Sequence, residues 1–275
     1  MERRVLVTGS NSGIGLQVAL QLARDGFRVI GSARDPAATE AVHKAAAEAG
    51  VTIDTEVLDV TDPAAAERVV PGLALWGLVN NAGYIEAGTV VDVEPDAVRR
   101  QFETLVFGPM RLAQLAIPGM RRRGEGRIVN VTSAVAHAGG ALLGWYTAAK
   151  QALTAATEAL RVEVAAWGID VMAVEPGATR TPIWDGAAAL LRQRAQTSLT
   201  PRAYARGQQL IDAALPRLGD PGQVAVVVSG ALRAGRPRAV YRVGADAALM
   251  RAAARLIPTA AKDRLTSGAL RLKGD

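Results

Sequence analysis

The stretch that decides the fold lies at residues 3–15 and reads RRVLVTGSNSGIG. Its apolar run predicts a short buried strand, and apolar residues at helical spacing predict an amphipathic helix directly after it. Gly9, Gly13 and Gly15 lie between the two elements in a Gly-x-x-x-Gly-x-Gly pattern. A glycine-rich turn at a helix N-terminus lets the backbone approach a pyrophosphate and offers it free N–H groups. We therefore expect a dinucleotide site at this turn.

Beyond this stretch, short apolar runs alternate with helical segments along the chain. Such alternation is typical of a parallel sheet that is buried on both faces and joined by right-handed crossovers. We expect one α/β domain over residues 1–275, a doubly wound Rossmann-type parallel sheet of about seven strands flanked by helices. Residues 182–216 break the alternation and are expected to form a helical lid over the substrate, and residues 245–275 a C-terminal helical extension. The predicted strands are residues 5–8, 28–33, 52–59, 77–80, 127–132, 170–175 and 239–243.

A second pattern indicates the chemistry. Tyr146 and Lys150 form a Tyr-x-x-x-Lys pair, and Ser133 precedes the tyrosine by thirteen residues. Residues four apart share one face of a helix. A free phenol has a pKa of about 10, too high for a general acid/base at neutral pH, and a neighbouring ammonium would lower it. With the Ser133 hydroxyl on a substrate carbonyl or alcohol, the three groups can move a proton while another group moves a hydride.

These motifs, together with Asn80-Asn81-Ala82-Gly83 and Pro176-Gly177, resemble the short-chain dehydrogenase/reductase family in order and spacing over roughly residues 3–245. The resemblance implies an oxidoreductase that interconverts CH–OH and carbonyl groups with a nicotinamide dinucleotide, with Ser133, Tyr146 and Lys150 as its catalytic residues. By the same resemblance, the expected cofactor contacts are Gly9, Ser10, Ser12, Gly13, Ile14, Gly15, Asp59, Val60, Asn80, Ala82, Gly83, Tyr146, Lys150, Pro176, Gly177, Thr179 and Thr181.

The end of the second predicted strand bears on which dinucleotide binds. In a dinucleotide fold this point meets the adenosine ribose, where an acidic residue selects NAD and an arginine can pair with the 2′-phosphate of NADP. Arg34 fits the second pattern, and Asp35 lies one residue beyond the expected acidic position. We therefore add Arg34 to the cofactor contacts and favour NADP(H) over NAD(H). The alternative is that Arg34 only points to solvent.

One position departs from the family. Members usually carry a catalytic asparagine in an Asn-x-x-Gly pattern, and here Leu105 takes its place before Gly108. By resemblance that asparagine holds a water that joins the lysine to a proton relay, and a leucine cannot hydrogen-bond this water. Thr104 and Asn130 are candidates to rebuild the relay. The alternative is an NADP-binding regulatory protein or a non-redox enzyme, such as an isomerase or lyase, on the same fold.

Four residues are expected to bind substrate: Ser133, His137, Trp145 and Trp184. Loops that follow parallel strands often carry specificity, and His137 follows Ser133 by four residues. The large apolar residues of the lid indicate an apolar or bulky substrate. A helical pair packed on its own core is the alternative reading of the lid, and Tyr204 is a candidate for an outlying pocket residue.

Composition and residue spacing argue against several classes of protein and of site. The chain has no cysteine, which excludes disulfides and thiol chemistry, and no His/Asp/Glu cluster has metal-ligand spacing, so we expect no metal. It has no apolar run that could span a bilayer and no room for a signal peptide before the first strand, so we expect a cytoplasmic protein.

The net charge of +6 raises the question of partners. No aromatic stacking platform accompanies it, and we assign the 121–123 arginine run to a helix end, so we expect no nucleic acid. The basic amphipathic tail could contact a membrane, but packing on the domain or on a neighbouring subunit is favoured. The resemblance implies a homodimer or homotetramer through helices near residues 101–122 and 146–167.

Overall fold

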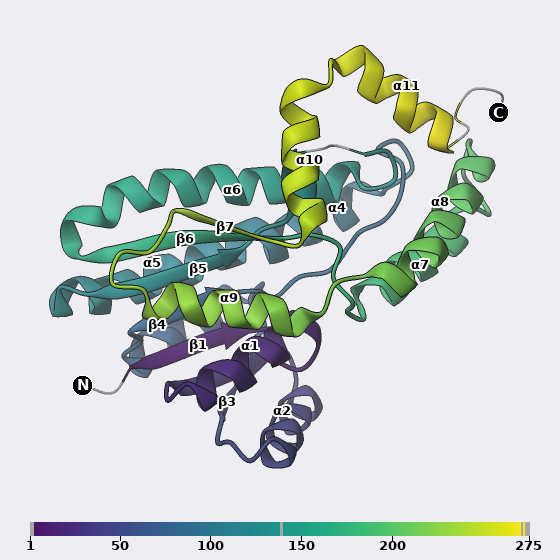
Figure 1. Ribbon diagram of the computed structural model, residues 1–275. Helices are drawn as coiled ribbons and strands as arrows, with labels where there is room; N and C mark the ends of the chain where they lie inside the picture. Colours follow the sequence, from purple (N-terminus) through teal and green to yellow (C-terminus); the bar gives the residue numbers. More distant parts are fainter. Residues whose placement is uncertain (1–2, 138–139, 271, 273–275) are drawn as a thin grey trace.

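The structure is a computed structural model that describes residues 3–137, 140–270 and 272. Within these residues, seven strands form a single parallel sheet in the order β3-β2-β1-β4-β5-β6-β7, with helices on both faces (Figure 1). The predicted α/β class, the doubly wound parallel sheet and its seven strands are therefore confirmed. The strands are β1 (Arg4–Thr8), β2 (Arg28–Ala33), β3 (Asp54–Val57), β4 (Gly77–Asn80), β5 (Gly126–Val131), β6 (Ile169–Pro176) and β7 (Val240–Val243).

The helices alternate with the strands, as the sequence predicted. A π-helical turn, η2 (Glu103–Phe107), joins two of them, and a short 3₁₀ turn, η3 (Ala134–His137), follows β5. The helices are α1 (Gly13–Arg24), α2 (Pro36–Glu48), α3 (Pro63–Val69), α4 (Pro95–Phe102), α5 (Gly108–Arg123), α6 (Gly144–Val164), α7 (Ile183–Arg194), α8 (Pro201–Ala214), α9 (Pro221–Arg233), α10 (Ala245–Leu256) and α11 (Thr259–Leu270).

The third strand is shorter than residues 52–59, the predicted range. It lies at the edge of the sheet, and its only ladder runs along β2, from Ile30 opposite Asp54 to Ala33 opposite Val57. Because one neighbour supplies every ladder bond of an edge strand, the length of that pairing limits the strand.

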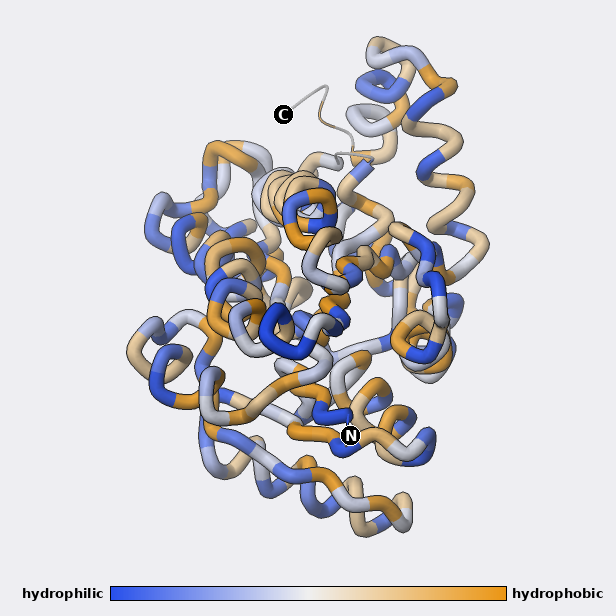
Figure 2. Tube along the Cα trace, turned by 90° about the vertical axis from the view of Figure 1, so that its left-hand side faces the viewer, coloured by the Kyte–Doolittle hydropathy of each residue, from blue (hydrophilic) through white to orange (hydrophobic). Residues whose placement is uncertain are grey.

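Successive residues of a strand belong to two separate hydrophobic clusters, one on each face of the sheet. Val5 and Val7 of β1 pack with α1 and α9 on one face of the sheet, whereas Leu6 packs with α3 and α5 on the other. This division follows from the two-residue period of a strand, which sends neighbouring side chains to opposite faces. Along the outer helices, hydrophobic and hydrophilic residues alternate, as expected of helices that bury one side (Figure 2).

A third cluster lies beyond the carboxyl ends of the strands and joins η2 and α6 to the segment predicted as a lid. It includes Leu105, Tyr146, Leu191 of α7 and Tyr204 of α8. Residues 182–216 thus hold two helices, α7 and α8, packed on the loop that follows β4 and on α6.

The C-terminal extension packs on the domain through two helices. α10 lies against η3, and α11 lies against α8, where Arg206 Nε donates to the Ala269 carbonyl at 3.2 Å. Leu270 is buried, while Leu249 and Leu256 face outward. Residues 271 and 273–275 of this predicted segment lie outside the described residues.

The arginine run at residues 121–123 ends α5, as predicted. Gly124 follows it with φ of 71°, and its N–H donates to the Arg121 carbonyl. A left-handed glycine after the last turn is the usual way for a helix to end, and cations there complement the helix dipole. The run is therefore explained by helix termination.

Candidate functional site

The glycine-rich turn after β1 is built so tightly that side chains would not fit in it. Gly9 has φ of +65°, and a Cβ there would lie 2.9 Å from the Ala82 Cα. A Cβ on Gly15 would lie only 2.1 Å from the Gly9 carbonyl oxygen. The Asn81 amide donates to the Thr8 carbonyl at 2.9 Å and so joins this turn to the loop after β4. Asn81, which the list of expected contacts left out, could have been found as the second residue of the Asn-Asn-Ala-Gly motif.

The N-terminus of α1 opens onto this turn. Its capping residue, Ser12, makes no side-chain hydrogen bond to the helix, and the first turn holds no acidic residue. The first turn of α1 and its capping residue thus leave the positive end of the helix dipole without a negative charge, which is the arrangement that a pyrophosphate needs. The residues present therefore fit a dinucleotide.

Two of the expected cofactor contacts lie in the interior. Ser10 is fully buried, and its hydroxyl donates to the Ser32 carbonyl at 3.2 Å. Asn80 is buried as well and donates to the Asn130 side-chain oxygen at 2.8 Å and to the Pro109 carbonyl at 3.1 Å. The side chains of both residues therefore hold the sheet and its loops together, and their contact with a cofactor stays a prediction.

The carboxylates near the expected adenosine position accept hydrogen bonds from backbone N–H groups at helix caps and turns. Asp35 accepts from the Ala38 N–H at 2.8 Å and caps α2, while Arg34 beside it is exposed. Asp59 accepts from the Thr61 N–H at 2.8 Å, and Asp62 caps α3. Arg34 is therefore the charged side chain at the end of β2 that remains open to a ligand.

The loop after β6 lies against the glycine-rich turn. A Cβ on Gly13 would come within 2.9 Å of the Thr181 methyl carbon. Thr179 is buried, and its carbonyl accepts from the Trp184 indole N–H at 2.9 Å. The predicted nicotinamide loop and the predicted pyrophosphate turn thus meet, although their residues are more than 160 positions apart in the sequence.

Ser133, Tyr146 and Lys150 come together at the carboxyl ends of β5 and β6. Tyr146 and Lys150 are buried on the first turns of α6, with the Lys150 Nζ 5.9 Å from the centre of the tyrosine ring. The Lys150 ammonium donates to the Val131 carbonyl at 2.8 Å, just before the serine in the chain. The Ser133 hydroxyl accepts from the Val135 N–H at 3.3 Å, and its interaction with the Tyr146 phenol lowers the pKa of that group. The sequence motif thus corresponds to a cluster in space.

Burial controls the proton affinity of this cluster. It raises the pKa of Tyr146 to about 12, and the interaction with Ser133 offsets part of that rise. Burial also lowers the pKa of Lys150 to about 8. The net shift of the Tyr146 pKa is therefore upward and not downward as expected, because desolvation outweighs the effects that favour the phenolate. At neutral pH Tyr146 is therefore a protonated donor beside a largely charged lysine.

Leu105 occupies the place of the usual asparagine within η2. It is buried and packs against the loop after β4, where a Cβ on Gly83 would lie 2.7 Å from its Cδ2. The two candidates for a rebuilt relay have other partners. The Thr104 hydroxyl donates to the Arg100 carbonyl, and the Asn130 amide donates to Thr157 at 2.8 Å. An apolar contact thus replaces the polar group at this position.

The expected substrate residues lie at different depths. Trp145 is half-buried at the start of α6 and donates to the Val90 carbonyl at 3.3 Å, and Trp184 is fixed on Thr179 at the start of α7. His137 is turned to Glu175, with its Nε2 2.8 Å from a carboxylate oxygen. Each tryptophan is therefore tied to a loop carbonyl, whereas the histidine contacts β6 and α10.

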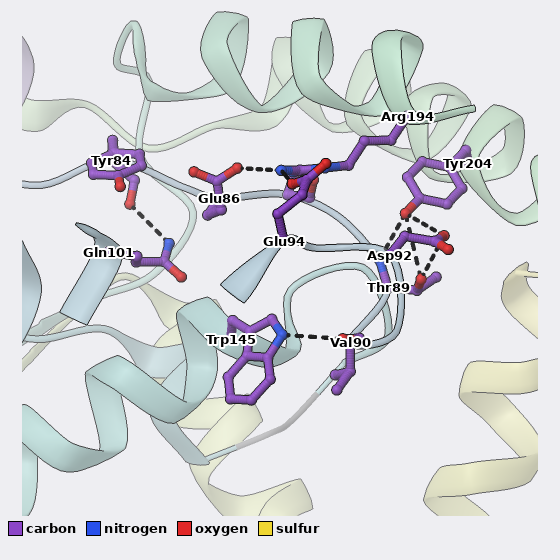
Figure 3. A network of polar contacts seen from close by, with 11 residues as sticks. Tyr84, Glu86, Thr89, Val90, Asp92, Glu94, Gln101, Trp145, Arg194 and Tyr204 are labelled. Carbon is purple, nitrogen blue, oxygen red and sulfur yellow. Dashed lines mark hydrogen bonds and ion pairs between the residues drawn. The ribbon is translucent and has the colours of Figure 1, made fainter. Parts of the chain in front are cut away.

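Sequence reasoning missed the polar network that anchors the lid (Figure 3). Arg194 of α7 donates to Glu86 at 2.6 Å and to Glu94 at 2.9 Å. The Tyr204 hydroxyl of α8 donates to Asp92 at 2.8 Å and accepts from the Thr89 N–H at 3.0 Å. Because Tyr204 is buried and its hydroxyl makes these bonds, the residue anchors α8 and does not line a pocket, contrary to the prediction. These partners are about 100 residues apart, and no local pattern pairs them.

Comparison with known proteins identifies the family. The family model described as short chain dehydrogenase matches residues 3–189. The chain belongs to the short-chain dehydrogenase/reductase family. It is therefore an oxidoreductase that acts on CH–OH groups with a nicotinamide dinucleotide.

Individual short-chain dehydrogenases agree in sequence and in fold. The uncharacterized oxidoreductase YusZ of Bacillus subtilis is 37% identical over 185 residues, which cover 65% of this chain and 66% of YusZ. A short-chain dehydrogenase from Streptomyces avermitilis has a TM-score of 0.79 at 30% identity, covering 100% of this chain and 98% of that one. An actinorhodin polyketide ketoreductase variant with NADPH has a TM-score of 0.76 at 30% identity, covering 88% and 95%.

The described part of the chain holds neither a metal cluster nor a membrane-spanning helix. No group of three or more His, Asp or Glu side chains there could hold a metal ion. None of the helices formed by the described residues is long and apolar enough to cross a membrane.

Proposed function

We propose that this protein is an NADP(H)-dependent oxidoreductase that interconverts a ketone or aldehyde and an alcohol on a bulky or apolar small molecule. The observation that carries the proposal is the cluster of half-buried Ser133 with buried Tyr146 and Lys150, at the same edge of the sheet where the glycine-rich turn meets the loop after β6. A proton donor and a dinucleotide cradle at one edge of the sheet are the two parts that this reaction needs.

The chain's own groups handle the substrate oxygen and its proton. NADP(H), when bound, supplies or accepts the hydride at the substrate carbon. Ser133 orients the carbonyl by hydrogen bonding, and Tyr146, whose pKa burial raises, donates the proton to the oxygen during reduction. The charged Lys150 favours the phenolate that remains and would hold the nicotinamide ribose. Alcohol oxidation is the reverse of these steps.

Residues at the end of β2 support NADP(H). The Asp35 carboxylate caps α2, so a ribose 2′-hydroxyl would compete with a helix N–H for it, whereas Arg34 is exposed and free to meet a phosphate. The actinorhodin polyketide ketoreductase, a structural relative, was solved with NADPH. The apolar cluster of Ile85, Leu142 and Leu191 around Tyr146 supports an apolar substrate.

Arg34→Ala is expected to lower the NADPH over NADH preference in kcat/KM by about tenfold, because a charge-assisted hydrogen bond to phosphate contributes about 1.5 kcal/mol. Turnover is followed by nicotinamide absorbance with each cofactor against a panel of ketones and aldehydes. Asp35→Asn is the matched control, since asparagine also caps a helix. An unchanged preference in Arg34→Ala would remove the arginine from the 2′-phosphate site.

The second candidate function, a regulatory or non-redox protein on this fold, has support from Leu105. Leu105→Asn is expected to keep turnover at or above that of the parent chain, because Ser133, Tyr146 and Lys150 stay in place. It should also lower the free energy of unfolding by about 1–3 kcal/mol, since a polar amide enters an apolar contact with Gly83. Kinetics and urea denaturation measure the two effects. A clear loss of turnover would mean that the leucine shapes the reactive pocket.

We also propose that the protein is a homo-oligomer that associates through α5 and α6. A groove of about 660 Å³ lies between these helices, lined in part by Ile117, Leu160 and Trp167. Apolar residues that line an open groove on neighbouring helices favour packing against a second copy. The groove does not include the triad, so association would leave the reactive edge open.

A further inference from the structure

Helix α10 contacts the two loops on which the proposed reaction depends. One is η3, which directly follows Ser133, and the other is the loop after β6, residues 177–181. The helix lies beyond β7, across the carboxyl ends of the strands (Figure 1). The seven strands pair with one another without α10, so these two contacts are not part of the sheet.

The contact with η3 runs through the His137 ring. Arg251 of α10 donates to the His137 Nδ1 at 2.5 Å, and the His137 Nε2 lies 2.8 Å from the Glu175 carboxylate. A guanidinium can only donate and a carboxylate can only accept, so the ring is assigned as neutral with its proton on Nε2. Arg242 of β7 holds the other Glu175 oxygen at 3.1 Å. Both nitrogens of His137 are thus engaged within the protein.

Glu175 makes this network relevant to the second loop. Its carboxylate is buried, and the residue directly precedes Pro176 and Gly177 at the end of β6. A buried carboxylate is tolerated when hydrogen bonds and opposite charges surround it. The network therefore joins the segment after Ser133, the end of β6 and α10.

The first turn of α10 holds the second loop directly. The Asp246 carboxylate accepts from the Ala178 N–H at 2.7 Å. It lies so close to the backbone that a Cβ on Gly177 would meet it at 2.0 Å, and one on Gly244 at 2.4 Å. Glycine at both positions lets the carboxylate reach the loop. An acidic residue two positions after Gly244, the glycine between β7 and α10, is the sequence signal for this contact.

We propose that α10 sets the position of the Ser133 segment relative to the loop after β6, with Asp246 and Arg251 as positioning residues. The inference rests on the proposed function, because the two loops matter together only if substrate and nicotinamide meet between them. Loosening either contact would let the proton-transferring groups and the nicotinamide drift apart, and misplacement by about 1 Å can cost about a hundredfold in rate. His137 then acts by holding Ser133 and not by binding substrate.

The test compares Asp246→Ala and Arg251→Ala with Arg255→Ala, which changes an exposed residue of the same helix. We expect each of the first two to lower kcat by roughly 10- to 100-fold while KM for NADPH changes less than threefold. The deuterium isotope effect on kcat, measured with NADPH labelled at the transferred position, should rise in both. Asp246→Asn keeps an acceptor for the Ala178 N–H, so its kcat should lie near that of the parent chain and above that of Asp246→Ala.

A purely structural role would give a different result. A variant that only unfolds in part has fewer active molecules, and its isotope effect stays at the parent value. Unchanged kcat and isotope effect in both alanine variants would overturn the proposal, and so would a loss of kcat without a change in isotope effect.

Hydrogen exchange separates this inference from the proposed function. Amides of residues 177–181 should exchange faster in Asp246→Ala, and those of residues 134–137 faster in Arg251→Ala, with NADPH present or absent. Exchange needs no turnover, so these changes would stand even if no carbonyl substrate were reduced. Unchanged exchange in both segments would refute the contacts as restraints, whatever the enzyme's activity.

Discussion

Replacing Tyr146 with phenylalanine is expected to lower kcat by about 10²–10⁴-fold, the usual contribution of a positioned general acid or base. The substitution removes one oxygen and keeps the ring that packs beside Ala149 and Leu105. Binding of NADPH should stay within a fewfold of the parent value, because the cradle around the glycine-rich turn is untouched. Turnover by nicotinamide absorbance and NADPH titration by fluorescence measure the two quantities.

A matched control removes the same atom elsewhere. Tyr241→Phe deletes a phenol oxygen that accepts from the Arg238 N–H at 2.9 Å on β7, away from the triad. It should leave kcat unchanged. Ordinary turnover in Tyr146→Phe, with Tyr241→Phe equally active, would contradict the assignment of Tyr146 as acid and base. Loss of NADPH binding in Tyr146→Phe would instead show that the ring supports the cofactor site.

The fold was predictable from the sequence because a short apolar run marks each of its strands. Residues 28–33 and 77–80 match β2 and β4 to the residue, since apolar runs flanked by polar turns leave little choice of bounds. The parallel arrangement follows once helices separate the strands, whereas the order of the strands was not predicted. β3 was overestimated because its length depends on a neighbour and not on its own residues.

The site was predictable in composition but not in its contacts. The spacing of Tyr146 and Lys150 on one helix fixes their relation, so the motif could be read directly. The pKa of Tyr146 could not, because burial arises from the lid, α6 and the loops after the strands, which meet only in the folded chain. The same holds for His137, whose partners lie 38 and 114 residues away.

Arg194→Ala is expected to be the most destabilising of the substitutions considered, at about 3–5 kcal/mol. The Arg194 side chain is 9% exposed and Glu86 only 8%, so the pair is shielded from water. Burial alone would lower the pKa of Arg194, but hydrogen bonds and attraction from Glu86 and Glu94 together raise it. The arginine is therefore fully charged, and its removal strands a buried carboxylate.

The expected loss corresponds to a fall in Tm of about 10 °C for a chain of this size, measurable by calorimetry or thermal circular dichroism. Arg192→Ala, on the exposed side of the same helix, should change the free energy of unfolding by less than about 0.5 kcal/mol. Equal stability of Arg194→Ala and Arg192→Ala would show that leaving the Glu86 carboxylate without Arg194 carries no free-energy cost.

The double variant Arg194→Met with Glu86→Leu decides what the ion pair is for. If the cost of Arg194→Ala comes from the unpaired Glu86 carboxylate, removing both charges should restore most of the stability. We expect Arg194→Ala to raise KM for the carbonyl substrate, and the double variant to keep that raised KM, because both lose the Arg194 hydrogen bond to the Ala87 carbonyl that fixes the loop after β4 beneath α7. Restored stability with a raised KM would identify the Arg194–Ala87 contact as the one that positions α7 over the loop after β4. Restored stability with an unchanged KM would confine its role to stability.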